Sequence, residues 1–187
     1  MLKNKKAKGF TLLETVATIA IVSIVTLFFW IKVETVQEKR DLEISSRIIS
    51  EVYLKYIRRS IELNEEYILD VYLVDKKIEI KNKYEKKIET VTLPKKLFYE
   101  VVYDKKLYKK FTTSTTSNGN LSKSFSIYIF NYKKYLKRKI TFYVFNANKI
   151  LVINNYIKTE SEKIPQENII KYHYSEENQN NKGWLYE

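Results

Sequence analysis

The chain has 187 residues, enough for one ordinary domain and an additional segment, and carries 34 basic and 22 acidic residues for a formal net charge of +12. It has no cysteine and one histidine, His173, which excludes disulfides, thiolate chemistry and any site built on several histidines. With three glycines and two prolines it is not a collagen-like or Gly/Pro-rich disordered chain, and a glycine-rich nucleotide loop has almost no place in it.

A short basic leader precedes a long apolar stretch. The first nine residues contain no acid and four lysines, which are Lys3, Lys5, Lys6 and Lys8. Residues 10–31 then carry a single charge, Glu14. As a helix this stretch would be about 33 Å long, enough to cross the hydrocarbon core of a membrane. Lysines on its N-terminal side favour a cytoplasmic N-terminus and export of the remaining chain.

Two ordinary explanations of this stretch fit it poorly. A cleavable secretory signal has a shorter apolar stretch followed by small residues, whereas Ala17 and Ala20 lie inside this one. A plain single-pass anchor accounts for the hydrophobicity but not for Glu14. A carboxylate inside an apolar segment costs a few kcal/mol unless it finds a partner, so Glu14 is treated as functional.

Residues 8–14, KGFTLLE, resemble the class III leader of type IV prepilins and of the pseudopilins of secretion and competence systems. In that family a basic leader ends in glycine, phenylalanine often follows, and the fifth mature residue is glutamate. The resemblance implies that a membrane prepilin peptidase cuts between Gly9 and Phe10 and methylates the new amino terminus of Phe10. A glycine suits the cut, because a residue without Cβ lets the protease approach the peptide bond closely.

The same resemblance gives Glu14 a role in assembly. Its carboxylate would pair with the Phe10 ammonium group of a neighbouring subunit and set the axial register of a helical filament. The alternative is that Glu14 simply lies in the membrane interface and is solvated there. Removal of the leader would also leave 30 basic and 22 acidic residues, a net charge of +8, so the four leader lysines concern topology and processing only.

Helical features continue beyond the apolar stretch. No glycine or proline occurs between Phe10 and Leu93, and charges alternate at every fourth residue from Lys39 to Lys55, which we interpret as a solvated helix face. We predict one helix from Phe10 to between Ser60 and Asn64, apolar in residues 10–31 and amphipathic in residues 32–64. Its apolar stripe consists of Leu42, Ile49, Val52, Tyr56 and Leu63.

The pattern changes to short strands after this helix, in a β-rich domain of residues 65–155. Residues 112–126 are predicted as a polar loop or a bulged edge of the sheet, and residues 131–139 and 146–149 as turns. The expected fold class is α+β and pilin-like, with the long helix packed on a small antiparallel sheet. Its element order resembles the minor pseudopilins of the H type and related competence subunits. The predicted strands are residues 67–74, 78–81, 88–93, 97–103, 125–130, 140–145 and 150–154.

The last segment, residues 156–187, is a polar C-terminal extension. Its composition predicts that parts of it are mobile. Two aromatic clusters within it, residues 172–174 and 184–186, are candidates for docking on the sheet.

No catalytic set can be assembled from this sequence, so an enzyme is not predicted. One histidine and no cysteine exclude Cys–His pairs, no motif surrounds a serine as in a Ser–His–acid triad, and His173 is interpreted as a surface or packing residue. No calcium-loop spacing occurs, and no metal, cofactor or small-molecule substrate is expected. The 16 tyrosines are interpreted as sheet packing rather than base stacking, because they alternate with aliphatic residues.

These features predict a structural subunit of a cell-envelope filament, a minor pilin or pseudopilin of a type IV pilus, type II secretion or competence system. It would be a single-pass membrane protein with a cytoplasmic N-terminus, and its partners would be the prepilin peptidase, other pilin or pseudopilin subunits and the membrane. The alternative is a membrane-anchored binding domain that never assembles. Such a domain could contact DNA in a competence system, although its basic residues are interleaved with acids.

Overall fold

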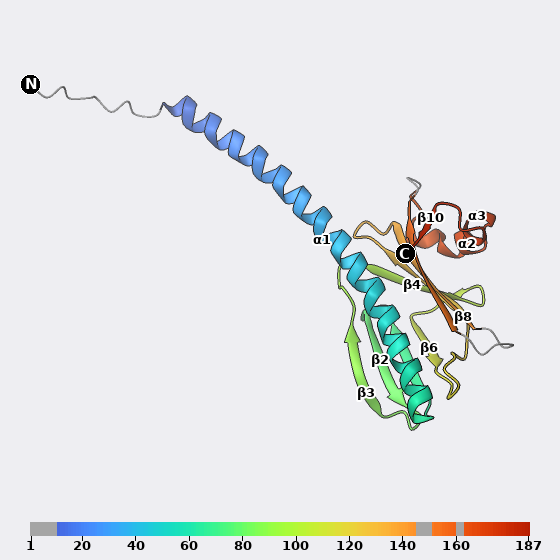
Figure 1. Ribbon diagram of the computed structural model, residues 1–187. Helices are drawn as coiled ribbons and strands as arrows, with labels where there is room; N and C mark the ends of the chain where they lie inside the picture. The colour runs from blue at the N-terminus through green and yellow to red at the C-terminus, as the bar shows by residue number, and fades with distance from the viewer. Residues whose placement is uncertain (1–10, 145–150, 160–162) are drawn as a thin grey trace, which may run out of the picture. The chain divides into compact units, whose positions relative to one another are not determined.

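The computed structural model describes residues 11–144, 151–159 and 163–187, apart from the side chain of residue 31 (Figure 1). The chain divides into two compact units, Met1–Lys39 and Arg40–Glu187. The predicted leader and cleavage site, and the predicted turn at residues 146–149, lie outside the described residues.

A single helix, α1 (Leu12–Leu63), contains 52 residues and enters both units. It continues without a break because no glycine or proline interrupts it. It ends at Leu63, before Asn64 adopts a left-handed conformation with φ of 50°. The predicted C-terminal boundary, between Ser60 and Asn64, is therefore confirmed.

In the second unit, α1 has a buried and a solvated face, as its periodicity predicts. Ile49, Tyr53 and Tyr56 are at most 1% exposed, whereas Arg47 and Glu51 form an exposed ion pair with a 4.0 Å separation. An exposed pair of this kind contributes a few tenths of a kcal/mol, so burial of the aromatic face holds the helix in place. Leu63, predicted in the apolar stripe, is 53% exposed at the last residue of the helix, so the prediction is wrong for this position.

Antiparallel strands form two sheets, where one was predicted. We call the first sheet A; its strand order is β3 (Lys87–Thr92), β2 (Lys77–Asn82), β1 (Tyr67–Tyr72) and β6 (Lys110–Ser114). The second, sheet B, has the order β10 (Trp184–Tyr186), β9 (Leu151–Lys158), β8 (Leu136–Val144), β7 (Phe125–Phe130), β4 (Phe98–Tyr103) and β5 (Lys106–Leu107). Three short helical segments follow β9, namely η1 (Gln166–Asn168), α2 (Ile169–His173) and α3 (Glu176–Gln179).

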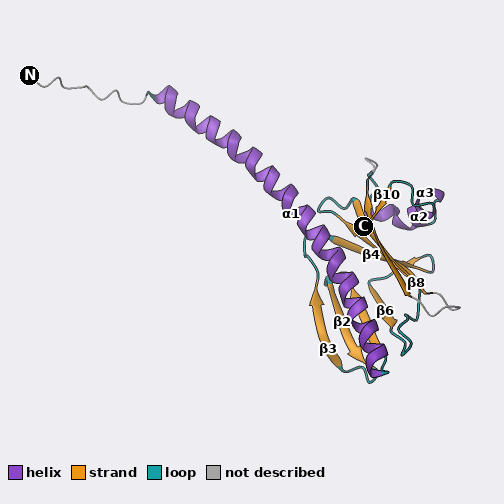
Figure 2. Ribbon diagram, viewed as in Figure 1, coloured by secondary structure: helices purple, strands orange, loops and turns teal. Residues whose placement is uncertain are grey.

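One main core lies between α1 and both sheets (Figure 2). Tyr53 of α1 packs on Phe142 and Phe125 of sheet B, with ring centroids 4.5 and 5.8 Å away, and Tyr56 packs edge-on against Tyr67 of sheet A. A second, smaller core covers the opposite face of sheet B, where Tyr128 and Phe130 meet Ile169 and Tyr172 from the segment after β9. The predicted α+β class, with a long helix packed on antiparallel strands, is confirmed.

Two predicted loops prove to contain strands. Residues 112–126 were expected to form a loop or a bulged edge; residues 112–114 belong to β6, which pairs with β1 at the edge of sheet A. Its threonines are β-branched, and Phe111 and Thr113 face the interior. Residues 131–139 were expected to form an exposed turn, but β8 begins at Leu136, and Arg138 and Lys139 are buried in it.

The C-terminal extension is folded where it is described. The prediction that residues 172–174 and 184–186 dock on the sheet is confirmed, since Tyr172 is 7% exposed and β10 pairs with β9. Strand β9 also runs to Lys158, beyond the predicted domain boundary at residue 155. Docking of this extension supplies the second core described above.

Gly119→Ala should lower the free energy of unfolding by about 1–3 kcal/mol, because two costs act together. Gly119 has φ of +77°, and an added Cβ would lie 2.4 Å from Ile61 Cδ1. Urea unfolding of the full-length chain in non-ionic detergent, followed by tryptophan fluorescence, measures the change. Ile61→Ala in the same chain removes the clash but not the backbone strain, so it should restore part of the loss. If the losses of unfolding free energy in the two single variants simply add up in the double variant, the side chain added at position 119 does not clash with Ile61.

Candidate processing and assembly site

The start of α1 is closed by a reciprocal cap between Thr11 and Glu14. One Glu14 carboxylate oxygen accepts hydrogen bonds from the Thr11 backbone N–H at 2.8 Å and from its hydroxyl at 3.0 Å. In return, the Glu14 backbone N–H donates to Thr11 Oγ1 at 3.2 Å. This is a capping box, in which a Ser or Thr precedes a Glu by three residues. The one acid of the apolar stretch is thereby held at the end of the helix.

Hydroxyl groups deeper in the apolar part of α1 are satisfied within the helix itself. Each donates to the backbone carbonyl four residues earlier, at 2.7–3.2 Å; they belong to Thr15, Thr18, Ser23 and Thr26. In a hydrocarbon environment an unpaired hydroxyl would cost several kcal/mol, and these bonds remove that cost without a partner helix. The segment is therefore chemically compatible with lipid despite its threonines and serine.

By length and composition, α1 could cross a membrane. Its most apolar window has a mean hydropathy of 2.3 and none of it is buried within the structure. Leu12, Phe28 and Trp30, for example, are 83%, 69% and 72% exposed. A soluble monomer rarely leaves an apolar surface of this size uncovered.

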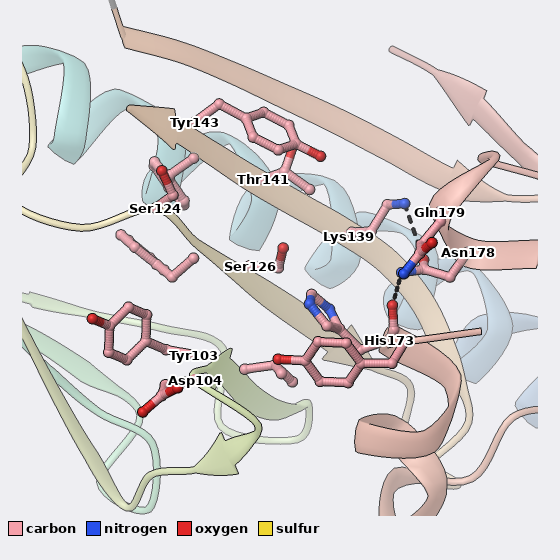
Figure 3. Close-up of a pocket in the computed structure, with 14 residues that line it drawn as sticks. Tyr103, Asp104, Ser124, Ser126, Lys139, Thr141, Tyr143, His173, Asn178 and Gln179 are labelled. Atoms are coloured by element: carbon pink, nitrogen blue, oxygen red, sulfur yellow. Dashed lines mark hydrogen bonds between the residues drawn. The ribbon is translucent and has the colours of Figure 1, made fainter. Parts of the chain in front are cut away.

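A polar hollow of about 380 Å³ lies on the face of sheet B that carries the second core (Figure 3). Its walls include Ser126 and Thr141 of the sheet, Lys139 of β8, and His173 and Asn178 of the C-terminal helices. Lys139 Nζ donates to the side-chain oxygens of Asn178 at 3.1 Å and Asn181 at 2.8 Å. These bonds fasten α3 to the sheet.

His173 belongs to the same polar network. Its Nδ1 lies 2.7 Å from the Tyr128 hydroxyl, and that hydroxyl accepts a hydrogen bond from Asn178 Nδ2 at 3.2 Å. Burial, together with the charge of Lys139, lowers the pKa of His173, so the ring is neutral near pH 7. No acid takes part in the hydrogen bonds described above, and among the described residues no group of three or more His, Asp or Glu could hold a metal ion. The arrangement is that of a packing network.

Lys139 should make the stability of the protein depend on pH above neutrality. It is 2% exposed, and burial, with a smaller contribution from the Lys158 charge, lowers its pKa to about 8. The folded state disfavours the charged ammonium group, so burying it lowers the free energy of unfolding at pH values below about 8. This cost disappears as the pH rises from about 8 toward 10.5, the ordinary pKa of lysine in the unfolded chain.

Relative to a Lys139→Met variant, the full-length protein should therefore gain about 2 kcal/mol of unfolding free energy between pH 7 and 10.5. Urea unfolding of both chains at matched pH values measures the difference, because the remaining lysines titrate equally in both. A difference that stays constant with pH would contradict a lowered pKa for Lys139.

Residues 4–30 match the family described as the prokaryotic N-terminal methylation motif. The chain carries the N-terminal signature of type IV pilins and pseudopilins. This prepilin-type motif includes the leader lysines from Lys5 onward, Gly9, Phe10 and Glu14, and it ends within the apolar part of α1. The resemblance predicted from KGFTLLE is thereby confirmed.

Two solved structures show a weaker relationship to this chain. Two structures of the minor pseudopilin EpsH from the type II secretion system of Vibrio cholerae align with TM-scores of 0.45 and identities of 12% and 11%. The alignments cover 59% and 62% of this chain and 94% and 96% of those chains. A search of curated proteins finds no significant match to this sequence.

Of the predicted site residues in the prepilin-type motif, the structure describes Glu14. Gly9, Phe10 and the leader lysines lie outside the described residues, so cleavage, methylation and topology remain predictions. The capping role of Thr11 was not predicted, although the pattern Thr11-x-x-Glu14 before an apolar run is the known signature of a capping box. Glu14 thus has a partner within its own chain before any neighbour is considered.

Proposed function

We propose that this chain is a minor pilin or pseudopilin, a structural subunit that a prepilin peptidase cuts after Gly9 and methylates at Phe10. The observation that carries this proposal is the prokaryotic N-terminal methylation motif at residues 4–30, which continues into an exposed apolar helix. The subunit would insert as a single-pass precursor with its N-terminus in the cytoplasm. It would then join a filament of a type IV pilus, type II secretion or competence system.

In this proposal the apolar half of α1 packs with the same segment of other subunits, which covers the surface left exposed in the monomer. Glu14 pairs with the Phe10 ammonium group of a neighbour. The capping box supports this role, because it holds the carboxylate at the start of α1, close in sequence to the amino terminus that cleavage would create at Phe10. The role is structural, and no cofactor is required for it.

Mass spectrometry of the mature N-terminal peptide, from the membrane fraction of the producing cell, tests the proposal. The expected product begins with N-methylated Phe10. An intact Met1 would contradict it and favour the alternative of a membrane-anchored binding domain. Gly9→Val is the matched control, because its branched Cβ should obstruct the peptidase and leave the precursor uncut.

A further inference from the structure

A groove runs between the end of β1, the start of β4 and the segment around η1. Two adjoining hollows of about 480 and 400 Å³ form it, and they share Glu100, Leu107 and Gln166 as lining residues. The apolar side chains of the groove are accessible, since Val74 is 73% and Leu107 41% exposed. We call this feature the lysine groove, because Lys76, Lys109, Lys133 and Lys134 also line it.

The charge of the lysine groove is positive and largely unpaired. Lys109, Lys133 and Lys134 make no ion pair with any carboxylate in the described ranges, and Lys76 and Lys134 lie over the Phe98 ring, at 4.8 and 5.0 Å from its centroid. Two acids oppose these four lysines. Glu167 is exposed, while Glu100 is half-buried and accepts a hydrogen bond from Gln166, and its pKa is raised by burial. A partner for this groove should combine apolar side chains with carboxylates.

The chain itself carries a surface of that chemistry. At the end of α1 and in the turn after it, Ile61 and Leu63 are 56% and 53% exposed, although both are aliphatic. Three exposed acids accompany them: Glu62, Glu65 and Glu66. We call residues 61–66 the acidic tip. Arg58 and Arg59 precede it by one turn, and one of its acids, Glu65, accepts a 3.3 Å hydrogen bond from the Tyr67 hydroxyl. The acidic tip itself contains no basic residue, so its own charge is negative.

The two surfaces lie at opposite ends of one strand. The acidic tip directly precedes β1 (Tyr67–Tyr72), and the lysine groove begins directly after it, at Leu73 and Val74. Six residues of strand separate them by about 20 Å. The tip therefore cannot fill the groove of its own molecule, and the two can meet only between copies. A contact between two different patches repeats from copy to copy unless it closes into a ring.

We propose that the lysine groove of one copy receives the acidic tip of a second copy. Ile61 and Leu63 lie against Val74, Phe98 and Leu107, and the carboxylates lie among the unpaired lysines. The repetition of this contact along a filament rests on the proposed function, whereas the contact between the folded domains of two copies does not.

The absence of cysteine from the chain makes site-specific crosslinking a clean test. Two differently tagged full-length chains, one with Leu63→Cys and one with Val74→Cys, are produced together and mildly oxidised in membranes. The matched control replaces Val74→Cys by Tyr84→Cys, which is equally exposed at 76% but lies in the turn between β2 and β3. We expect the Leu63–Val74 pair to give roughly tenfold more mixed disulfide dimer than the Leu63–Tyr84 pair.

Charge exchange adds a second measurement. Reversing the three acids of the tip to lysine should abolish the crosslink, and reversing Lys109, Lys133 and Lys134 to glutamate in the partner chain should restore it. Equal yields with the Val74 and Tyr84 positions would overturn the proposal. Crosslinking of Val74→Cys to another protein, without any link to Leu63→Cys, would also overturn it. The same holds if a single-stranded oligonucleotide protects the Val74→Cys thiol from maleimide.

The test is separate from that of the proposed function. The mature N-terminal mass is read from the same samples. A crosslink between chains that retain Met1 would support the contact and contradict the filament role. A methylated Phe10 without the specific crosslink would support the filament role and contradict the contact.

Discussion

Glu14→Gln should leave the chain inserted and cleaved but reduce its incorporation into filaments by about tenfold or more, because one lost ion pair in a poorly solvated site exceeds about 1.4 kcal/mol. The amide keeps the size and hydrogen-bonding capacity of the carboxylate but loses the charge that would pair with the Phe10 ammonium group. The amount of the chain in the sheared filament fraction, divided by the amount in the membrane, measures the effect.

The capping box makes this test more specific. Gln serves as well as Glu at the third position of a capping box, so Glu14→Gln preserves the cap and removes only the charge. Thr11→Ala does the opposite: it removes the hydroxyl that Glu14 contacts at 3.0 Å and keeps the charge. That change should weaken the start of the helix by about 1 kcal/mol and reduce incorporation less than Glu14→Gln does. Normal incorporation of Glu14→Gln with failure of Thr11→Ala would mean that Glu14 acts as a cap alone.

The sequence predicted well those elements whose pattern is local. The motif at the N-terminus, the end of α1 and strands such as β2 and β7 all follow from runs of residues that are read within a short window. The motif in particular depends on fixed spacing from a cleavage site, so it needs no tertiary information. The match of residues 4–30 to the N-terminal methylation motif depends on that local spacing alone.

The elements that were missed depend on contacts between distant residues. The first half of strand β8 contains three charged residues, and one of them, Lys139, is buried where Asn178 and Asn181, some forty residues later, accept its hydrogen bonds. The division into two sheets likewise depends on pairing choices, such as β6 beside β1, that no local pattern specifies. The lysine groove combines residues from the segment after β1, from β4 and from η1, so it could not be seen along the chain.

Tyr53→Phe and Tyr53→Ala should have opposite consequences for stability, although both remove the same hydroxyl. Tyr53 is fully buried between α1 and sheet B, and its hydroxyl has no hydrogen-bond partner within the described ranges. Phe keeps the ring against Phe142 and removes an unsatisfied polar group, so the unfolding free energy should stay the same or rise by up to about 1 kcal/mol. Ala leaves a cavity in the main core and should lower it by about 3–5 kcal/mol.

Tyr56→Phe is the control that gives the comparison its meaning. Tyr56 is equally buried on the same helix, but its hydroxyl donates to Glu89 at 2.6 Å, so the same change removes a hydrogen bond to a charged group. It should cost about 1.5–3 kcal/mol, against no loss for Tyr53→Phe. Urea unfolding of the full-length chains in detergent measures all three. A loss above about 1 kcal/mol for Tyr53→Phe would show that a buried water satisfies its hydroxyl. Equal losses for the two phenylalanine variants would mean that hydrogen bonding does not distinguish these two positions of the core.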